Sequence, residues 1–274
     1  MRVIGICRFS YPAVGGFKRM HDTIEAREAY LYAPERMALR FRHFECLTLP
    51  SIAAQTDPDF TFLVLIGDSL PQRYRDRLHD LTAGVPQIRI VESPPMRHRP
   101  AMQAAITQAL GPDAPESVQF RLDDDDAVAT NFVSGLRWFL RHTQSLRRNW
   151  RSMAVEYSGG FAVRLSAQGI AARQLQTGFW ACGLAVWFRQ GVRKTVMNFA
   201  HHKLHHTMPT LIHPKPLMYL RAAHDDNDSA AGDSSGTLSA IDDDQRALFR
   251  RRFNVDEDRV KAAFSAPVGF RDTV

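Results

Sequence analysis

The chain has 274 residues, of which 45% are hydrophobic and 23% charged, and its formal net charge is +6 at neutral pH. These values are typical of an ordinary globular protein and exclude disordered and fibrous classes. No apolar run is long enough for a signal peptide or a spanning helix, which predicts a cytoplasmic protein. We expect residues 1–224 to form one domain, and residues 225–274 to form a mobile loop and a C-terminal helical tail.

Cysteine usage and charge limit the partners. Cys7, Cys46 and Cys182 stand singly in apolar surroundings, which argues against a disulfide framework and against a zinc site. The positive charge would suit nucleic acid, an anionic membrane surface or a phosphorylated substrate. However, the arginines have the spacing of solvated helix faces and are not interleaved with aromatic residues. We therefore expect no nucleic-acid partner, and a peripheral contact with the inner membrane surface stays open.

The first half of the chain alternates strands and helices. Continuous apolar runs predict buried strands, and apolar residues at intervals of three or four, such as Met37, Phe41 and Phe44, predict amphipathic helices. Strands are expected at 2–9, 60–66, 88–91 and 118–122, and helices at 34–51, 71–81, 100–110 and from 132 onward. This alternation implies right-handed crossovers, a mostly parallel sheet and ligands at the carboxyl ends of its strands.

The second half is less regular. Strands are expected at 153–157, 161–165, 179–188 and 217–220, and helices at 192–200 and 239–252. Gly159 and Gly160 should end the first of these strands. Pro209, Pro214 and Pro216 should prevent regular structure ahead of the last one.

Residues 123–126 are four consecutive aspartates, placed directly after the strand expected at 118–122. Adjacent carboxylates repel one another, and partial shielding from water strengthens that repulsion until a cation, an arginine or a proton relieves it. Oxygen ligands of this kind are what Mg²⁺ and Mn²⁺ prefer. The alternative is a solvated acidic loop that caps the next helix.

Three segments in this order resemble nucleotide-sugar-dependent glycosyltransferases of the GT-A fold. The first is 49–60, a helix end with a Gln-Thr-Asp turn that leads into the strand at 60–66 and Asp68. The second is 121–127, similar to the family's Asp-x-Asp-Asp pattern, and the third is 224–229, which supplies a late histidine. More narrowly, the chain from about 2 to 230 resembles the bacterial putative rhamnosyltransferase family, which opens with a strand ending in Arg-Phe, here Arg8-Phe9.

The resemblance implies a GT-A-like, Rossmann-like α/β fold with a mixed, mostly parallel sheet flanked by helices. It implies an enzyme that moves a sugar, rhamnose being one candidate, from a nucleoside diphosphate donor to a glycan, a lipid-linked acceptor or another hydroxyl group. A divalent ion, Mn²⁺ or Mg²⁺, would stabilise the charge that accumulates on the leaving diphosphate. The metal ligands implied are Asp123, Asp125 and His224. The implied donor contacts are Arg8, Asp68, Arg97, Arg121 and Asp123.

The chain departs from its relatives at the catalytic base, because no Asp or Glu lies between Trp180 and His206. A base for the acceptor hydroxyl should have a pKa near the working pH, which histidine has without adjustment. Two histidine pairs spaced four apart in 201–206 would share a face if the helix at 192–200 continued. The candidate catalytic residues are His202 and His205, either of which could act as the base, and Asp126, which could bind the metal, cap a helix or orient the acceptor.

Two other classes of function stay open. Metal-dependent phosphoryl transfer or hydrolysis also uses acidic clusters at strand ends. A non-catalytic basic module that binds nucleotides or glycans is supported only by the net charge.

Overall fold

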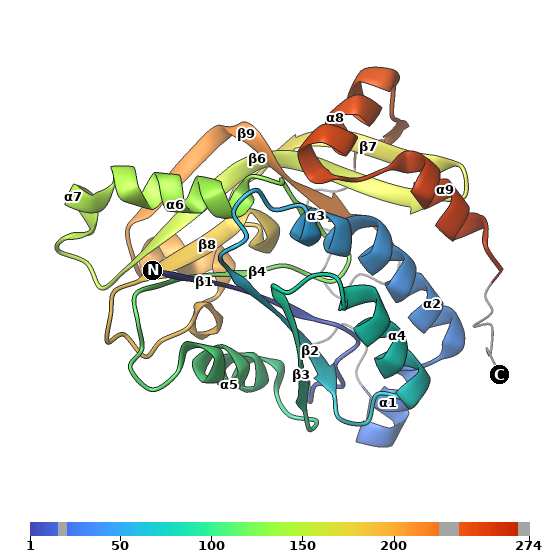
Figure 1. Cartoon of the computed structure of the whole chain (residues 1–274), viewed down its shortest axis with the longest axis horizontal. Helices are drawn as coiled ribbons and strands as arrows, with labels where there is room; N and C mark the ends of the chain where they lie inside the picture. Colours follow the sequence, from blue (N-terminus) through green and yellow to red (C-terminus); the bar gives the residue numbers. More distant parts are fainter. Residues whose placement is uncertain (16–20, 225–235, 268–274) are drawn as a thin grey trace.

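The computed structural model of the protein describes residues 1–15, 21–224 and 236–267. Its sheet has the strand order β10-β7-β6-β8-β4-β1-β2-β3, with β9 beside β6 and the short β5 beside β9. The expected α/β architecture, a mixed sheet flanked by helices, is confirmed (Figure 1). Most of the expected mobile loop, including the acidic residues after His224, lies outside the described residues.

The first half of the sheet is parallel. Strands β1 (Arg2–Arg8), β2 (Thr61–Gly67), β3 (Ile88–Ser93) and β4 (Ser117–Arg121) run in the same direction in the order β4-β1-β2-β3. All four were expected from the sequence. Their carboxyl ends therefore meet at one edge of the sheet, where the aspartates follow β4.

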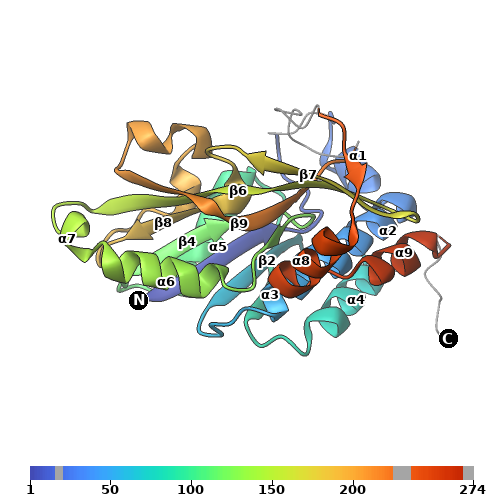
Figure 2. The same ribbon diagram turned by 90° about the horizontal axis from the view of Figure 1, so that it is seen from above.

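These strands are buried on both faces, as their continuous apolar runs predict. In β2, Phe62 and Val64 belong to the larger core cluster, whereas Leu63 and Leu65 belong to the smaller one on the opposite face. The larger cluster lies under helices α2 (Pro34–His43), α3 (Leu49–Ala53), α4 (Gln72–Thr82), α6 (Phe132–His142), α8 (Asp243–Phe253) and α9 (Glu257–Ser265). The smaller one lies under α5 (His98–Leu110) and the segment 196–208, so the sheet is covered on both sides (Figure 2).

The helix expected at 34–51 forms in three parts. A π-helical turn, Phe44–Thr48, connects α2 to α3. Such a turn inserts an extra residue into the helical repeat, and it is found mostly at functional sites. Here it places Thr48 against the acidic loop, because Thr48 Oγ1 donates to the carbonyl oxygen of Asp126 at 2.8 Å. Helix α1 (Ile24–Leu31), which precedes this helix, was not expected.

The second half of the sheet is mostly antiparallel and differs from expectation. Strand β6 (Ser152–Ser166) continues through Gly159 and Gly160 instead of ending there. The reason is close approach to β9 (Thr210–Ala222): a Cβ at Gly160 would lie 2.5 Å from Tyr219, and one at Gly159 would lie 3.0 Å from the carbonyl oxygen of Pro216. The glycines therefore serve the pairing of β6 with β9 and do not break the strand.

The expectation that the prolines prevent regular structure was also wrong for two of them. Pro214 and Pro216 lie within β9, where the register against β6 shifts around Gly159. Proline is tolerated at such irregularities, where a ladder hydrogen bond is not required. The remaining strands are the unexpected β7 (Gly169–Gln176), the two-residue β5 (Ala127–Val128) and β10 (Ser239–Ala240), and β8 (Leu184–Phe188), which follows a 3₁₀ turn at Ala181–Gly183.

No continuous helix forms at 192–200. Between residues 196 and 206 the chain instead makes two 3₁₀ segments, Val196–Asn198 and His201–His206. Each is closed by short-range hydrogen bonds, such as that from the Thr207 amide to the Leu204 carbonyl at 2.8 Å. A 3₁₀ helix has three residues per turn, so side chains four apart do not share a face. The geometry that was expected to pair the histidines is therefore absent from this segment.

The C-terminal helix expected up to residue 252 is α8, whose N-cap is Asp242 with a capping box to Gln245. It is followed by α9, which was not expected. Both helices contribute to the larger core: the Phe249 ring of α8 lies 5.0 Å from that of Phe161, and Val260 of α9 is fully buried. Within the described part of the chain, no helix is long and apolar enough to cross a lipid bilayer.

Candidate functional site

The loop that carries the four aspartates is fixed by its backbone. It leaves β4 with the Leu122 amide bonded to the Ile6 carbonyl at 3.1 Å, and it turns where the Asp126 amide bonds to the Asp123 carbonyl at 3.2 Å. Three of the four aspartates are buried and only Asp123 is exposed. This is not a solvated acidic loop, because burying carboxylates without partners would cost too much free energy.

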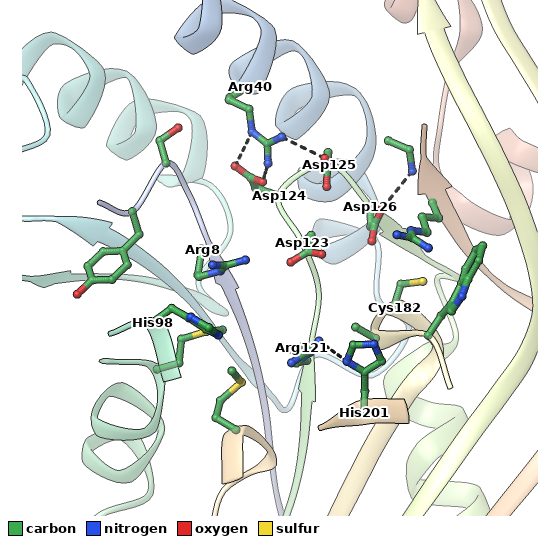
Figure 3. A pocket seen from close by; sticks show the side chains of 18 of the residues that line it. Arg8, Arg40, His98, Arg121, Asp123, Asp124, Asp125, Asp126, Cys182 and His201 are labelled. Atoms are coloured by element: carbon green, nitrogen blue, oxygen red, sulfur yellow. Dashed lines mark hydrogen bonds and ion pairs between the residues drawn. The ribbon is translucent and has the colours of Figure 1, made fainter. Parts of the chain in front are cut away.

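Arg40 of α2 offsets the charge of two of these carboxylates. Its Nε donates to Asp124 Oδ2 at 3.1 Å and its Nη1 to Asp125 Oδ2 at 3.1 Å, and its Nη2 forms a further ion pair with Asp124 Oδ1 (Figure 3). The planar fork of a guanidinium suits such a carboxylate pair. Asp124 is thus paired with Arg40.

Two histidines lie behind Asp125. His224 Nε2 donates to Asp125 Oδ2 at 2.7 Å, and the His43 ring lies 4.5 Å from the His224 ring. Burial alone would raise the pKa of Asp125, but Arg40 and His224 outweigh it and lower that pKa below its usual range. Burial, and then His224, lowers the pKa of His43 to about 4. His224 therefore acts here as a partner of Asp125.

The surroundings of Asp126 shift its pKa in the opposite direction from that of Asp125. Its Oδ1 accepts a hydrogen bond from the Ala222 amide at 3.0 Å. Burial, and then the charges of Asp125 and Asp123, raise the pKa of Asp126 well above its usual range. Two neighbouring carboxyl groups of one loop thus differ strongly in their affinity for a proton, a pattern that often accompanies acid–base chemistry.

The residues fit a divalent cation. Oxygen atoms of Asp123, Asp125 and Asp126 all lie within 4.8 Å of one another. The set consists only of carboxylate oxygens, which hard cations such as Mg²⁺ and Mn²⁺ prefer over other ligands. Carboxylates this close repel one another, and a cation held among them would relieve that repulsion.

The aspartates face a cavity of about 210 Å³ at the carboxyl ends of β1 and β4. Positive charge lines the same cavity: its wall includes the arginines Arg8, Arg36, Arg40, Arg121 and Arg221. In Figure 3, Asp123 lies between Asp124 with its Arg40 partner and Arg121. A cavity with both carboxylates and guanidinium groups can hold a metal ion together with a phosphorylated anion.

A third histidine touches the cavity from the 3₁₀ segment His201–His206. Arg121 Nη2 donates to His201 Nδ1 at 2.8 Å, so this nitrogen is the unprotonated acceptor. Burial, and then Arg121, lowers the pKa of His201 to about 4. On the other wall, burial and the nearby Arg8 lower the pKa of His98 to about 4. Both imidazoles are therefore neutral at pH 7.

The structure brings some of the residues expected from the sequence together and leaves others apart. The ones that line the cavity are Arg8, Arg121, Asp123, Asp125 and Asp126. His224 reaches Asp125 from behind. Four others are exposed and lie outside the cavity lining, namely Asp68 at the end of β2, Arg97 ahead of α5, and His202 and His205.

Sequence reasoning missed Arg40, His43 and the contact of His201. Arg40 was grouped with arginines of solvated helix faces, yet it is buried. A signal was present, because Arg40 lies three residues after Met37 and four before Phe44, on the face of α2 that enters the core. A charged residue on the apolar face of a helix needs a partner, and the aspartates are that partner.

Comparison with known proteins gives the family. Residues 2–235 match the family described as "Putative rhamnosyl transferase", and the chain belongs to that family. The family assignment expected from the sequence is thus confirmed, and the family's description names a sugar-transferring enzyme, as expected. No curated protein matches the chain.

Among solved structures, the chain is similar to S. aureus TarS. The structure of TarS 1–349 in complex with UDP-GlcNAc has 10% sequence identity and a TM-score of 0.48, with 83% of this chain and 60% of TarS 1–349 covered. The complex with UDP has 10% identity and a TM-score of 0.46, with coverages of 81% and 61%. A longer TarS structure has a TM-score of 0.45 at 10% identity, with 81% of this chain and 37% of that one covered. The chain thus spans about three fifths of TarS 1–349.

Proposed function

We propose that this protein transfers a sugar from a nucleoside diphosphate sugar to a hydroxyl group of a glycan or lipid-linked acceptor, with Mn²⁺ or Mg²⁺ as cofactor. The observation that carries the proposal is the single cavity that joins a carboxylate triplet to five arginines. Membership of the family supports the choice of sugar transfer over phosphoryl transfer and hydrolysis, which use similar acidic clusters.

Asp123 and Asp125 would hold the metal ion. When bound, the ion supplies positive charge that stabilises the leaving diphosphate. Arg8 and Arg121 would add further positive charge on the adjoining walls of the cavity. Arg40 and His224 fix the Asp125 carboxylate by two hydrogen bonds, so that little reorganisation would accompany binding.

For a transfer with inversion, a base must accept the proton of the acceptor hydroxyl. Among the three candidate catalytic residues from the sequence, Asp126 is the one that lines the cavity. The Ala222 amide holds its Oδ1, so Oδ2 would take the proton. Burial and the neighbouring aspartates raise the pKa of Asp126, which increases the affinity of its carboxylate for a proton.

The proposal is tested by calorimetric titration of UDP, GDP and dTDP with and without Mn²⁺. We expect binding that requires Mn²⁺ and that is abolished in Asp125→Ala. The matched control is Asp80→Ala, which removes an exposed carboxylate from α4 and should leave binding unchanged. Unchanged binding in Asp125→Ala would sink the proposal.

Two further assays of the wild-type protein distinguish the rival functions. A transferase consumes the nucleotide sugar faster when an acceptor glycan is added, whereas a hydrolase does not. A nucleic-acid module would instead show strongly salt-dependent affinity for oligonucleotides. The family description makes rhamnose the first donor sugar to test, in a panel of UDP-, GDP- and dTDP-linked sugars.

A further inference from the structure

Two segments of the chain carry basic residues and no acidic residue of their own. Residues 131–155, which comprise α6, α7 (Gln144–Arg147) and the start of β6, contain five arginines and no Asp or Glu. The loop 189–194 after β8 adds two arginines and a lysine, again with no acidic residue. Two of the eight basic side chains are in ion pairs: Arg137 with Asp57 and Asp59, and Arg147 with Glu116. The other six are exposed, namely Arg141, Arg148, Arg151, Arg189, Arg193 and Lys194.

The two segments form one surface. Arg189 Nη2 donates to the Arg147 carbonyl at 3.0 Å, and the Arg189 amide donates to the Arg151 carbonyl at 3.0 Å. Ser152 pairs with Phe188 at the ends of β6 and β8. Figures 1 and 2 both place α7 at one extremity of the molecule, far from α9. The six charges therefore act together at one end of the protein.

The segment 131–155 also exposes large apolar side chains. Trp138 is 52% exposed, Leu146 55% and Trp150 49%, all within thirteen residues of sequence. Tryptophan beside arginine is typical of segments that lie at the boundary between water and lipid headgroups. Trp138 and Arg141 also border a hollow of about 440 Å³ whose lining contains Tyr157 and His213 but no carboxylate.

We propose that the surface formed by α6, α7 and the loop 189–194 docks onto a membrane rich in anionic lipid. Basic side chains near such a membrane are attracted by its negative potential, and indole rings insert among the headgroups. Nucleic acid would meet the same positive charge, but an exposed leucine such as Leu146 gains from insertion into lipid and not from contact with phosphate. The proposal does not depend on the transferase activity.

The test is flotation of the full-length protein with vesicles of phosphatidylcholine alone or with 30% phosphatidylglycerol. We expect binding to the anionic vesicles only, weakened by high salt because surface charges are screened. Arg141→Gln, Arg148→Gln and Arg151→Gln together should weaken that binding roughly a hundred-fold, since each basic residue near the surface contributes about fivefold. Trp138→Ser with Trp150→Ser should also weaken it, and this loss should persist at high salt.

The matched control removes the same charge elsewhere. Arg89, Arg251 and Arg259 are exposed on β3, α8 and α9, and their joint replacement by Gln should leave vesicle binding within about twofold. Equal losses in both triple variants would show that net charge alone is responsible and would overturn the proposal. Equal binding to neutral and anionic vesicles would also overturn it. A third contrary result is binding of a labelled oligonucleotide that is lost in the Arg141→Gln, Arg148→Gln, Arg151→Gln variant, together with no binding of vesicles.

Discussion

The acidic run 123–126 and the histidine-rich run 201–206 both look like sites in the sequence, yet the structure treats them differently. Three of the four aspartates are buried, and side chains or amides from distant segments contact them: Arg40, Thr48, Ala222 and His224. In the histidine run, His201 contacts Arg121, whereas His202, His205 and His206 are exposed.

The difference shows what makes a cluster of like residues a candidate site. Density in the sequence is common to both runs, but only the aspartates lie where the parallel strands end and several elements converge. The exposed histidines stack on neighbours of their own surface, such as His205 on Phe179 with ring centroids 4.5 Å apart. Convergence of distant residues, and not local composition, separates the two.

The largest effect should come from exchanging the candidates for the catalytic base. Asp126→Asn should lower kcat by about 10²–10⁴-fold, the usual contribution of a general base, with the loss in kcat and not in the KM for the donor. The double variant His202→Ala with His205→Ala should change kcat by less than about threefold, because both residues lie outside the cavity. Steady-state kinetics with donor and acceptor would measure both. The opposite ranking would assign the base to the histidines and reverse the comparison.

A second test removes the counter-charge of the acidic run. Arg40→Met should lower the free energy of unfolding by about 3–5 kcal/mol, because it leaves Asp124 and Asp125 buried without their partner. Urea denaturation in EDTA would measure this loss without support from a metal ion. Arg251→Met, at an exposed position of α8, is the control and should cost less than about 1 kcal/mol. If adding Asp124→Leu to Arg40→Met did not recover stability, the loss would not be due to the unpaired charge.

The smallest effect is a pH dependence. The pKa of His43 is lowered to about 4 in the folded protein, mainly by burial and then by His224, although Asp125 opposes the shift. Folding therefore favours the neutral form of His43. The resulting contribution to the free energy of unfolding is fully present above about pH 6.5, the pKa of histidine in the unfolded chain, and is lost as the pH falls to about 4. Wild type should lose at most about 3 kcal/mol more than His43→Gln over this interval in urea denaturation. Parallel curves for the two proteins would contradict the assignment, and His142→Gln, at an exposed position, should follow wild type.

Much of the parallel half of the fold could be predicted from the sequence. Runs such as Phe62–Ile66 are apolar on both faces, and local pattern is enough to identify a strand of that kind. The acidic loop, too, could be located, because its place after β4 follows from the order of strands and helices. The ligand candidates that this order brings to the sheet edge, Asp123 and Asp125, line the cavity.

The antiparallel half could not be predicted in the same way. Whether Gly160 ends a strand or lets a neighbour approach depends on Tyr219, which is 59 positions away in the sequence. The partners of the aspartates raise the same difficulty. Arg40 precedes Asp125 by more than 80 residues, and His224 follows it by more than 80 residues. Local patterns do not encode such contacts, because they arise only when the sheet has formed.

Strand β4 connects the candidate site with the basic surface. Its first residue, Ser117, pairs with Phe188 beside the loop 189–194, and its last residue, Arg121, borders the cavity. Five residues of strand span roughly 15 Å. The cavity and the basic surface are thus separated by about the length of one strand, so substitutions on the basic surface leave the cavity lining intact.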